Sequence, residues 1–180
     1  MWKSGAAIAL AVAAVLGGSI SNAVPASADG PDAAFKHEVL VQHNKYRAQY
    51  GARPLTWSDA LYPAALEWAG QCKFQHSQAG GKYGENLYAF GGTDTGAAID
   101  QAMKAWMAEA AKYNYANPVF SGATGHFTQV VWKSTTQVAA AVVKCPADTI
   151  FSQPSVFVVA RYSPPGNYQG KFQQNVGRRV

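Results

Sequence analysis

The sequence lacks several features, and each absence excludes a class of protein. Fifteen Lys and Arg residues stand against ten Asp and Glu, but the excess is scattered, which argues against nucleic-acid binding and leaves only weak attraction to anionic surfaces. Arg178 and Arg179 are the only adjacent pair, at a terminus that we expect to fray. No Asn-x-Ser/Thr sequon occurs, so N-glycosylation is not expected.

Long apolar runs are also missing. The one apolar run, residues 6–16, is well short of the roughly 20 residues that a membrane span needs. It follows Lys3 and precedes Ala26-Ser27-Ala28, the arrangement of a secretory signal with its cleavage site. We therefore expect residues 1–28 to be a signal peptide, and residues 29–180 to be a single secreted, extracellular domain with no transmembrane segment.

Cysteine is scarce as well, with Cys72 and Cys145 the only two. Outside the cell, such a pair most simply forms one disulfide. Closing a loop of this length contributes roughly 4 kcal/mol in the chain-entropy model. We expect a structural bridge, because a catalytic thiol would not stay reduced there.

Apolar spacing predicts three helices followed by three strands. The helices cover residues 33–50, with Asp32 as N-cap, residues 58–70, with a late start because of Pro63, and residues 97–113. Residues 71–96, rich in glycine and polar side chains, are predicted to form a long ordered loop. The strands are expected at residues 125–132, 137–144 and 155–162. This order favours an α+β domain.

The octapeptide Gly-His-Phe-Thr-Gln-Val-Val-Trp at residues 125–132 is the most informative stretch. Alternation with period two makes both faces largely apolar, which predicts a central strand with His126 at its end. A histidine there is either a core residue satisfied by one hydrogen bond or part of a site. Glu109 shares the apolar stripe of its predicted helix with Trp106 and Tyr113, so it is either solvated or buried with a partner.

These residues belong to a longer pattern that spans nearly all of residues 29–180. In order, it runs His43-Asn44-x-x-Arg47, His76-Ser77, Gly84-Glu85-Asn86-Leu87, Trp106-x-x-Glu109, the octapeptide, and Tyr162-x-Pro164-Pro165-Gly166-Asn167-Tyr168. The pattern resembles the CAP superfamily of cysteine-rich secretory proteins, antigen 5 and plant pathogenesis-related proteins of group one. Around residues 113–132 it is most similar to secreted fungal sterol-binding members. The resemblance implies a three-layer α-β-α sandwich with a short, mainly antiparallel central sheet.

The same resemblance brings His76, Glu85, Glu109 and His126 together in a cleft. With no positive partner nearby, two buried carboxylates would repel each other, and bound zinc, another divalent cation or shared histidine protons would relieve this. Three interpretations stay open: a polar network that holds the long loop, a metal site, or a metal-assisted hydrolase in which Glu85 or Glu109 acts as base. A nucleophile elbow, a free thiol and an H-E-x-x-H helix are all missing, which argues against an enzyme.

Departures from the family pattern are informative too. Many relatives carry cysteines where this chain has Ala140 and Ala160. We expect these two positions to lie nearly opposite each other in an antiparallel hairpin, within disulfide reach. The simplest account is that one whole bridge was lost while that between Cys72 and Cys145 was retained.

Tyr113, Tyr115 and Phe120 have the spacing of aromatic residues that sterol-binding relatives carry on a mobile loop. They either cap the core or form an exposed apolar patch suited to a flat lipid. The favoured function is a secreted, monomeric protein that binds sterols or related hydrophobic ligands, in defence or virulence. A metal-dependent hydrolase and a secreted interaction protein are the alternatives.

Overall fold

The computed structural model describes residues 30–180 and is built on a four-stranded sheet of order β1-β3-β4-β2. β3 (Gln137–Cys145) pairs antiparallel with β4 (Ser155–Ser163), and β4 pairs antiparallel with β2 (Gly84–Gly91). The short β1 (Thr56–Trp57) runs parallel to β3, so the sheet is mixed but mainly antiparallel. The predicted signal peptide lies outside the described residues.

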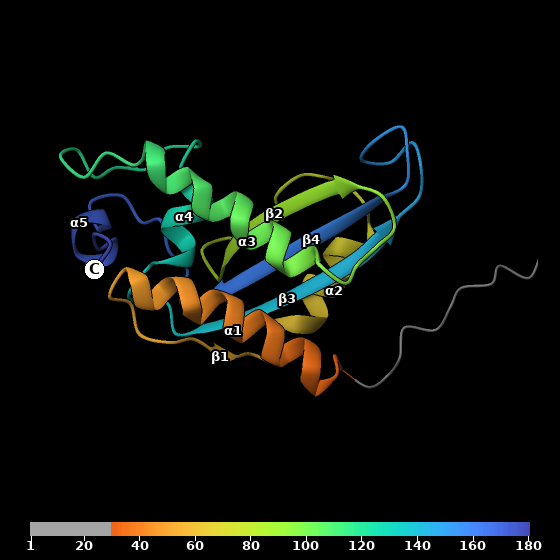
Figure 1. Ribbon diagram of the computed structural model, residues 1–180, viewed down its shortest axis with the longest axis horizontal. Helices are drawn as coiled ribbons and strands as arrows, with labels where there is room; N and C mark the ends of the chain where they lie inside the picture. Colours follow the sequence, from red (N-terminus) through yellow and green to blue (C-terminus); the bar gives the residue numbers. More distant parts are fainter. Residues whose placement is uncertain (1–29) are drawn as a thin grey trace, which may run out of the picture.

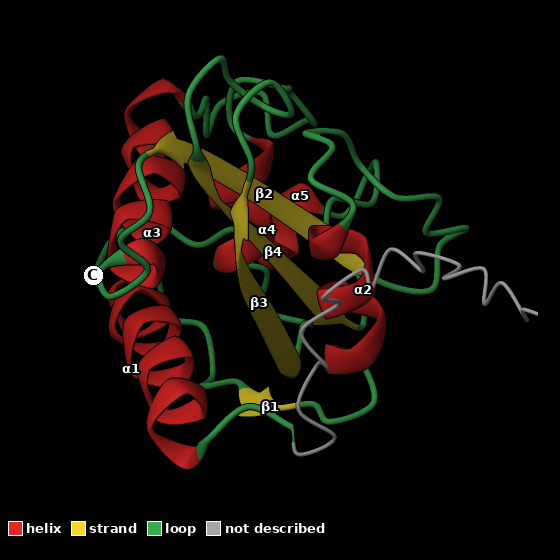
Figure 2. Ribbon diagram, turned by 90° about the vertical axis from the view of Figure 1, so that its right-hand side faces the viewer, coloured by secondary structure: helices red, strands yellow, loops and turns green. Residues whose placement is uncertain are grey.

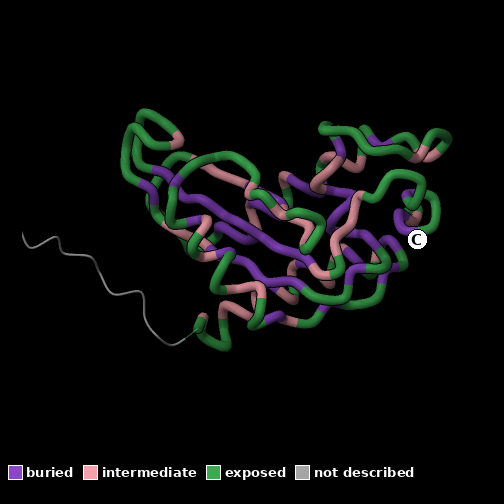
Figure 3. Tube along the Cα trace, turned by 180° about the vertical axis from the view of Figure 1, so that it is seen from behind, coloured by how far each residue is buried: buried purple, intermediate pink, exposed green. Residues whose placement is uncertain are grey.

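Helices cover both faces of this sheet. α1 (Ala33–Gln49) and α3 (Ala98–Ala108) lie on one side and α2 (Tyr62–Gly70) on the other (Figure 2). Alternate side chains of β4 pack against opposite helix layers. Val158 belongs to the core cluster with α1 and α3, and Val159 belongs to the cluster with α2. The strands accordingly form a long buried stretch of the chain (Figure 3). The predicted α-β-α sandwich is confirmed.

Shorter elements gather at one end of the sheet (Figure 1). The 3-10 helix η1 (Glu109–Lys112) continues α3, and α4 (Gly125–Val130) and α5 (Phe172–Asn175) follow later in the chain. No helix within residues 30–180 has the length and apolar character to cross a membrane.

Several local predictions hold at residue level. The Asp32 carboxylate accepts a hydrogen bond from the Phe35 backbone N–H at 2.7 Å and caps α1. β3 and β4 match their predicted strands to within one residue, and Ala140 lies directly opposite Ala160. The Cys72–Cys145 disulfide forms as expected, joining the end of α2 to the end of β3.

The predicted strand at residues 125–132 is wrong, because this segment forms α4 and its C-terminal turn. The two backbone N–H groups that open the helix, those of His126 and Phe127, donate to the Glu109 carboxylate at 3.0 and 3.1 Å. Unpaired N–H groups at a helix N-terminus need such an acceptor. The helix is therefore stabilised by a residue from η1, which outweighs the strand preference of the valines.

The predicted loop at residues 71–96 is wrong in part, because it contains β2. All eight residues of β2 pair with β4, from Gly84 opposite Tyr162 to Gly91 opposite Ser155. Glycine and polar residues have weak strand preference, so pairing with a buried neighbour determines the conformation here.

Arg47 ties α1 to the segment that follows α4. Its guanidinium is fully buried and donates to four backbone carbonyls, those of Arg53, Val130, Trp132 and Thr135, at 2.8 to 2.9 Å. Burial lowers its pKa to about 10. These carbonyls stabilise a cation that has no carboxylate partner among the described residues.

The C-terminal residues are docked rather than frayed. The Val180 backbone N–H donates to the Gln49 carbonyl at 2.9 Å, at the end of α1. The Tyr115 hydroxyl donates to the Gly177 carbonyl at 3.0 Å. The Arg178 guanidinium lies over the Tyr115 ring, which gives this arginine a defined position.

Candidate functional site

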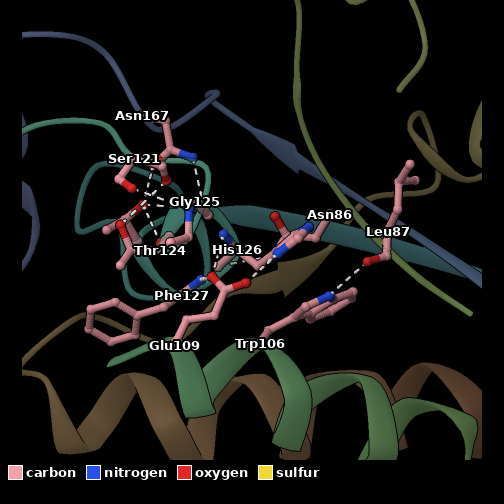
Figure 4. A network of polar contacts seen from close by, with 12 residues as sticks. Asn86, Leu87, Trp106, Glu109, Ser121, Thr124, Gly125, His126, Phe127 and Asn167 are labelled. Atoms are coloured by element: carbon pink, nitrogen blue, oxygen red, sulfur yellow. Dashed lines mark hydrogen bonds and ion pairs between the residues drawn. The ribbon is translucent and has the colours of Figure 1, made fainter. Parts of the chain in front are cut away.

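A cavity of about 380 Å³ opens where β2, α4 and the loop after β4 meet. His76, Glu85 and His126 line it, and Glu109 reaches His126 from η1 (Figure 4). The four residues implied by the family resemblance therefore come together in two pairs, each a histidine with a glutamate.

The first pair lies at the start of α4. His126 Nδ1 donates to Glu109 Oε1 at 2.6 Å, while Oε2 accepts the two N–H groups that open the helix. The imidazole stacks on Trp106, with ring centroids 6.2 Å apart. The Glu109 side chain is only 17 % exposed. Of the two alternatives predicted for it, solvated or buried with a partner, the structure shows the second.

The second pair lies between the segment before β2 and β2 itself. Glu85 Oε1 accepts His76 Nδ1 at 3.1 Å and the Ser77 backbone N–H at 2.9 Å. Oε2 accepts the Ser77 hydroxyl at 2.6 Å and Arg161 Nε at 3.1 Å. Burial on its own would raise the Glu85 pKa, but the hydrogen bonds from His76, Ser77 and Arg161 outweigh it and lower the pKa.

Arg161 is the residue of this network that the sequence patterns did not indicate. Its side chain and that of Glu85 are each only 4 % exposed, and its guanidinium lies 4.2 Å over the Tyr83 ring. The expectation that no positive partner lies nearby is wrong, because Arg161 pairs directly across the strands with Glu85. An arginine inside the apolar strand Ser-Val-Phe-Val-Val-Ala-Arg-Tyr-Ser was the available signal, since a buried cation needs a partner.

Two asparagines hold α4 and its surroundings. Asn86 on β2 donates to the His126 carbonyl at 3.1 Å (Figure 4). Asn167 donates to the Gly125 carbonyl at 2.9 Å and accepts the Thr128 hydroxyl at 2.6 Å. The loop after β4 is thereby fastened to the helix that carries His126.

The two imidazoles present equivalent nitrogens. Each uses Nδ1 to donate to its carboxylate, which can only accept, and in a neutral imidazole this leaves Nε2 as the nitrogen with a lone pair. No residue among 30–180 forms a hydrogen bond with either Nε2. Within the same range no three His, Cys, Asp or Glu residues form a group that could hold a metal ion.

The aromatic segment divides between two places. Tyr113 is buried, with ring centroids 5.7 Å from Phe127 and 4.7 Å from Tyr115, and its hydroxyl has no partner among the described residues. Tyr115 is partly buried. Phe120 is 53 % exposed at the rim of the histidine cavity, where a Cβ on Gly125 would lie 3.1 Å from its ring. The three rings do not form one surface.

Comparison with known proteins agrees with the geometry. The model of the CAP, or cysteine-rich secretory protein, family matches residues 40–162. Pathogenesis-related protein PR-1 of Medicago truncatula is 42% identical over 143 residues, which cover 76% of this chain and 78% of the relative. Secreted protein RBT4 of Candida albicans is 42% identical over 145 residues, which cover 77% of this chain but 37% of that longer protein.

Solved structures show the same fold. The crystal structure of NaASP2 with Zn²⁺ aligns with a TM-score of 0.68 at 26% identity, covering 85% of this chain and 90% of that one. BmVAL-1 aligns with a TM-score of 0.67 at 24% identity, covering 82% of this chain and 85% of that one. The family match, the PR-1 relative and the shared sandwich lead to one conclusion: the chain belongs to the cysteine-rich secretory protein (CAP) family.

Proposed function

We propose that the protein is an extracellular carrier of sterols or similar flat apolar molecules, bound at the segment from Tyr113 to Phe120. The observation that carries the proposal is an exposed apolar pair on this segment, Val119 at 38 % and Phe120 at 53 % exposure. Exposed apolar side chains beside a cavity are typical of ligand sites.

The segment is also weakly held. Between Ala116 and Ala123, its hydrogen bonds join residues no more than three positions apart and none reaches another part of the described chain. Such a loop can lift at low cost. A ligand that covers the exposed apolar surface of Val119 and Phe120 would gain roughly 25 cal/mol per Å² covered.

An extracellular location is part of the same proposal. The secretory signal at residues 1–28 supports it, as do relatives named for secretion and pathogenesis response. A role in defence or virulence is in keeping with those names.

Sterol binding is tested with two matched substitutions. Phe120→Ala removes the exposed ring on the segment, while Phe74→Ala removes a ring of similar exposure, 56 % against 53 %, that packs near Phe157. We expect Phe120→Ala to weaken binding of radiolabelled cholesterol and ergosterol about tenfold, and Phe74→Ala to leave it unchanged. Equal binding by both folded variants would refute the site, and absence of binding by wild type would favour an interaction protein.

A second candidate is divalent-cation binding by His76 and His126. Two imidazole Nε2 atoms with carboxylates behind them resemble the arrangement in which outer carboxylates orient histidine ligands. The related NaASP2 was crystallised with Zn²⁺. We expect calorimetry to detect zinc at pH 7, with affinity lost toward pH 5 as protons compete, and lost in His126→Ala. No heat at millimolar zinc would leave only a structural network.

A further inference from the structure

A second cavity, of about 590 Å³, lies beside the docked C-terminus. Its lining combines two arginines at one edge with tyrosine, methionine and alanine residues. The lining residues are Tyr50, Met107, Ala108, Ala110, Ala111, Tyr115, Arg178 and Arg179. The three alanines present only methyl groups, so this part of the wall leaves room for a ring.

The arginine edge is held in place. Tyr115 anchors the Gly177 carbonyl through its hydroxyl, and the Val180 N–H is bound to Gln49. The Arg178 guanidinium lies 4.6 Å from the centroid of the Tyr115 ring, a cation–π contact that places it beside the cavity. A ligand would therefore meet a positioned guanidinium.

The donors of this edge have no partner. No hydrogen bond or ion pair joins the side chain of either Arg178 or Arg179 to another residue of the described chain, and no acidic residue lines the cavity. The buried arginines behave differently, since Arg47 binds four carbonyls and Arg161 binds Glu85. Guanidinium forks match the oxygens of carboxylate, sulfonate and phosphate groups.

We propose that this cavity binds an aromatic organic anion. Its flat ring system lies on the alanine wall beside Tyr50 and Tyr115, and its anionic group accepts hydrogen bonds from Arg178 and Arg179. This ligand class differs from the neutral apolar molecules proposed above. The site also lies apart from the cavity of His76 and His126.

A matched pair of dyes tests the proposal. 8-Anilinonaphthalene-1-sulfonate and N-phenyl-1-naphthylamine share their rings, but only the first carries a sulfonate. We expect the wild-type protein to bind the anionic dye about tenfold more tightly, by fluorescence titration. In the double variant Arg178→Gln/Arg179→Gln this preference should vanish, with little change for the neutral dye.

Three controls make the result specific. Lys73→Gln/Lys144→Gln removes two exposed charges elsewhere and should keep the preference. Arg178→Lys/Arg179→Lys keeps the positive charges but removes the forked guanidinium donors, so it should retain only part of the preference for the anionic dye. Phe120→Ala should not alter it, so failure of sterol binding and failure of this site are distinguishable. Equal affinity of wild type for both dyes, or equal losses in the Gln variants of arginine and lysine, would overturn the proposal.

Discussion

The two histidine–glutamate pairs of the cavity use the same residue types but differ in what else holds each carboxylate. Glu85 is held by the Arg161 guanidinium and by Ser77. Glu109 is held by two backbone N–H groups at the start of α4. One carboxylate thus has a guanidinium cation as a partner, while the other accepts hydrogen bonds from backbone N–H groups.

The difference shows where each pair is vulnerable. Four groups donate to Glu85, and losing Arg161 removes the one guanidinium among them while the carboxylate stays buried. Glu109 accepts hydrogen bonds from the His126 ring and from the backbone N–H groups of His126 and Phe127. The two backbone bonds also stabilise the start of α4. We therefore expect a single substitution at the Glu85 pair to lower the free energy of unfolding more than a single substitution at the Glu109 pair.

The largest expected effect is that of Arg161→Met. It should lower the free energy of unfolding at pH 7 by about 3–5 kcal/mol, because Glu85 stays buried without a cation. Urea unfolding measures this, and Arg178→Met serves as control at an exposed arginine, with a change below about 1 kcal/mol. Similar losses in the two variants would show that Arg161 is not a buried partner.

The cost of Arg161→Met should also depend on pH. The native pKa of Glu85 is lowered, so the stability it contributes is present above its ordinary pKa and is lost as pH falls through the native value. Protonated Glu85 no longer needs a cation. The difference between wild type and Arg161→Met should therefore be smaller near pH 3 than at pH 7.

His43 extends the comparison to a histidine without a carboxylate. Its Nδ1 donates to the Val39 carbonyl and its Nε2 accepts from the Tyr162 hydroxyl. Burial lowers its pKa from 6.5 to about 4, so stability is full above pH 6.5 and falls by about 3 kcal/mol as pH drops toward 4. NMR titration should find His43 neutral at pH 5.5, where the histidine of an unstructured reference peptide is largely protonated. Protonated His43 in the native protein at that pH would contradict this.

Glu109→Ala should have an intermediate effect, about 1–2 kcal/mol, because α4 loses the acceptor at its N-terminus. Glu109→Gln keeps one acceptor oxygen and should cost less. Guanidinium unfolding measures both variants. A loss for Glu109→Ala as large as that for Arg161→Met would remove the distinction between the pairs.

The smallest effect is expected for His76→Ala. The His76 side chain is 60 % exposed, so its removal should change stability by less than about 0.5 kcal/mol. His126 is 29 % exposed and stacked on Trp106, so His126→Ala should cost more. Thermal unfolding compares the two variants, and a reversed order would show that the exposed pair is the stronger one.

Elements with local signals were predictable from the sequence. Asp32 indicated the start of α1, and the two positions at which relatives carry cysteines, Ala140 and Ala160, indicated the register of β3 and β4. The two-cysteine count was enough for the disulfide. The family pattern brought His76, Glu85, Glu109 and His126 to one place.

The errors share a physical cause. α4 carries strand-favouring valines but is stabilised by Glu109 at one end and by Arg47, which binds the Val130 carbonyl, at the other. β2 follows from pairing with β4. In each case the segment's conformation depends on a partner that is distant in sequence, and the periodicity of apolar residues cannot reveal such a partner.

Arg47 has a consequence for how the chain acquires its structure. Three of its four acceptors belong to residues 83 to 88 positions later, so a nascent α1 has only the Arg53 carbonyl with which to bury this cation. The first half of the polypeptide should thus remain open while it emerges from the ribosome. Docking of α1 has to wait until residue 135 is available, so that the domain closes late and as a unit.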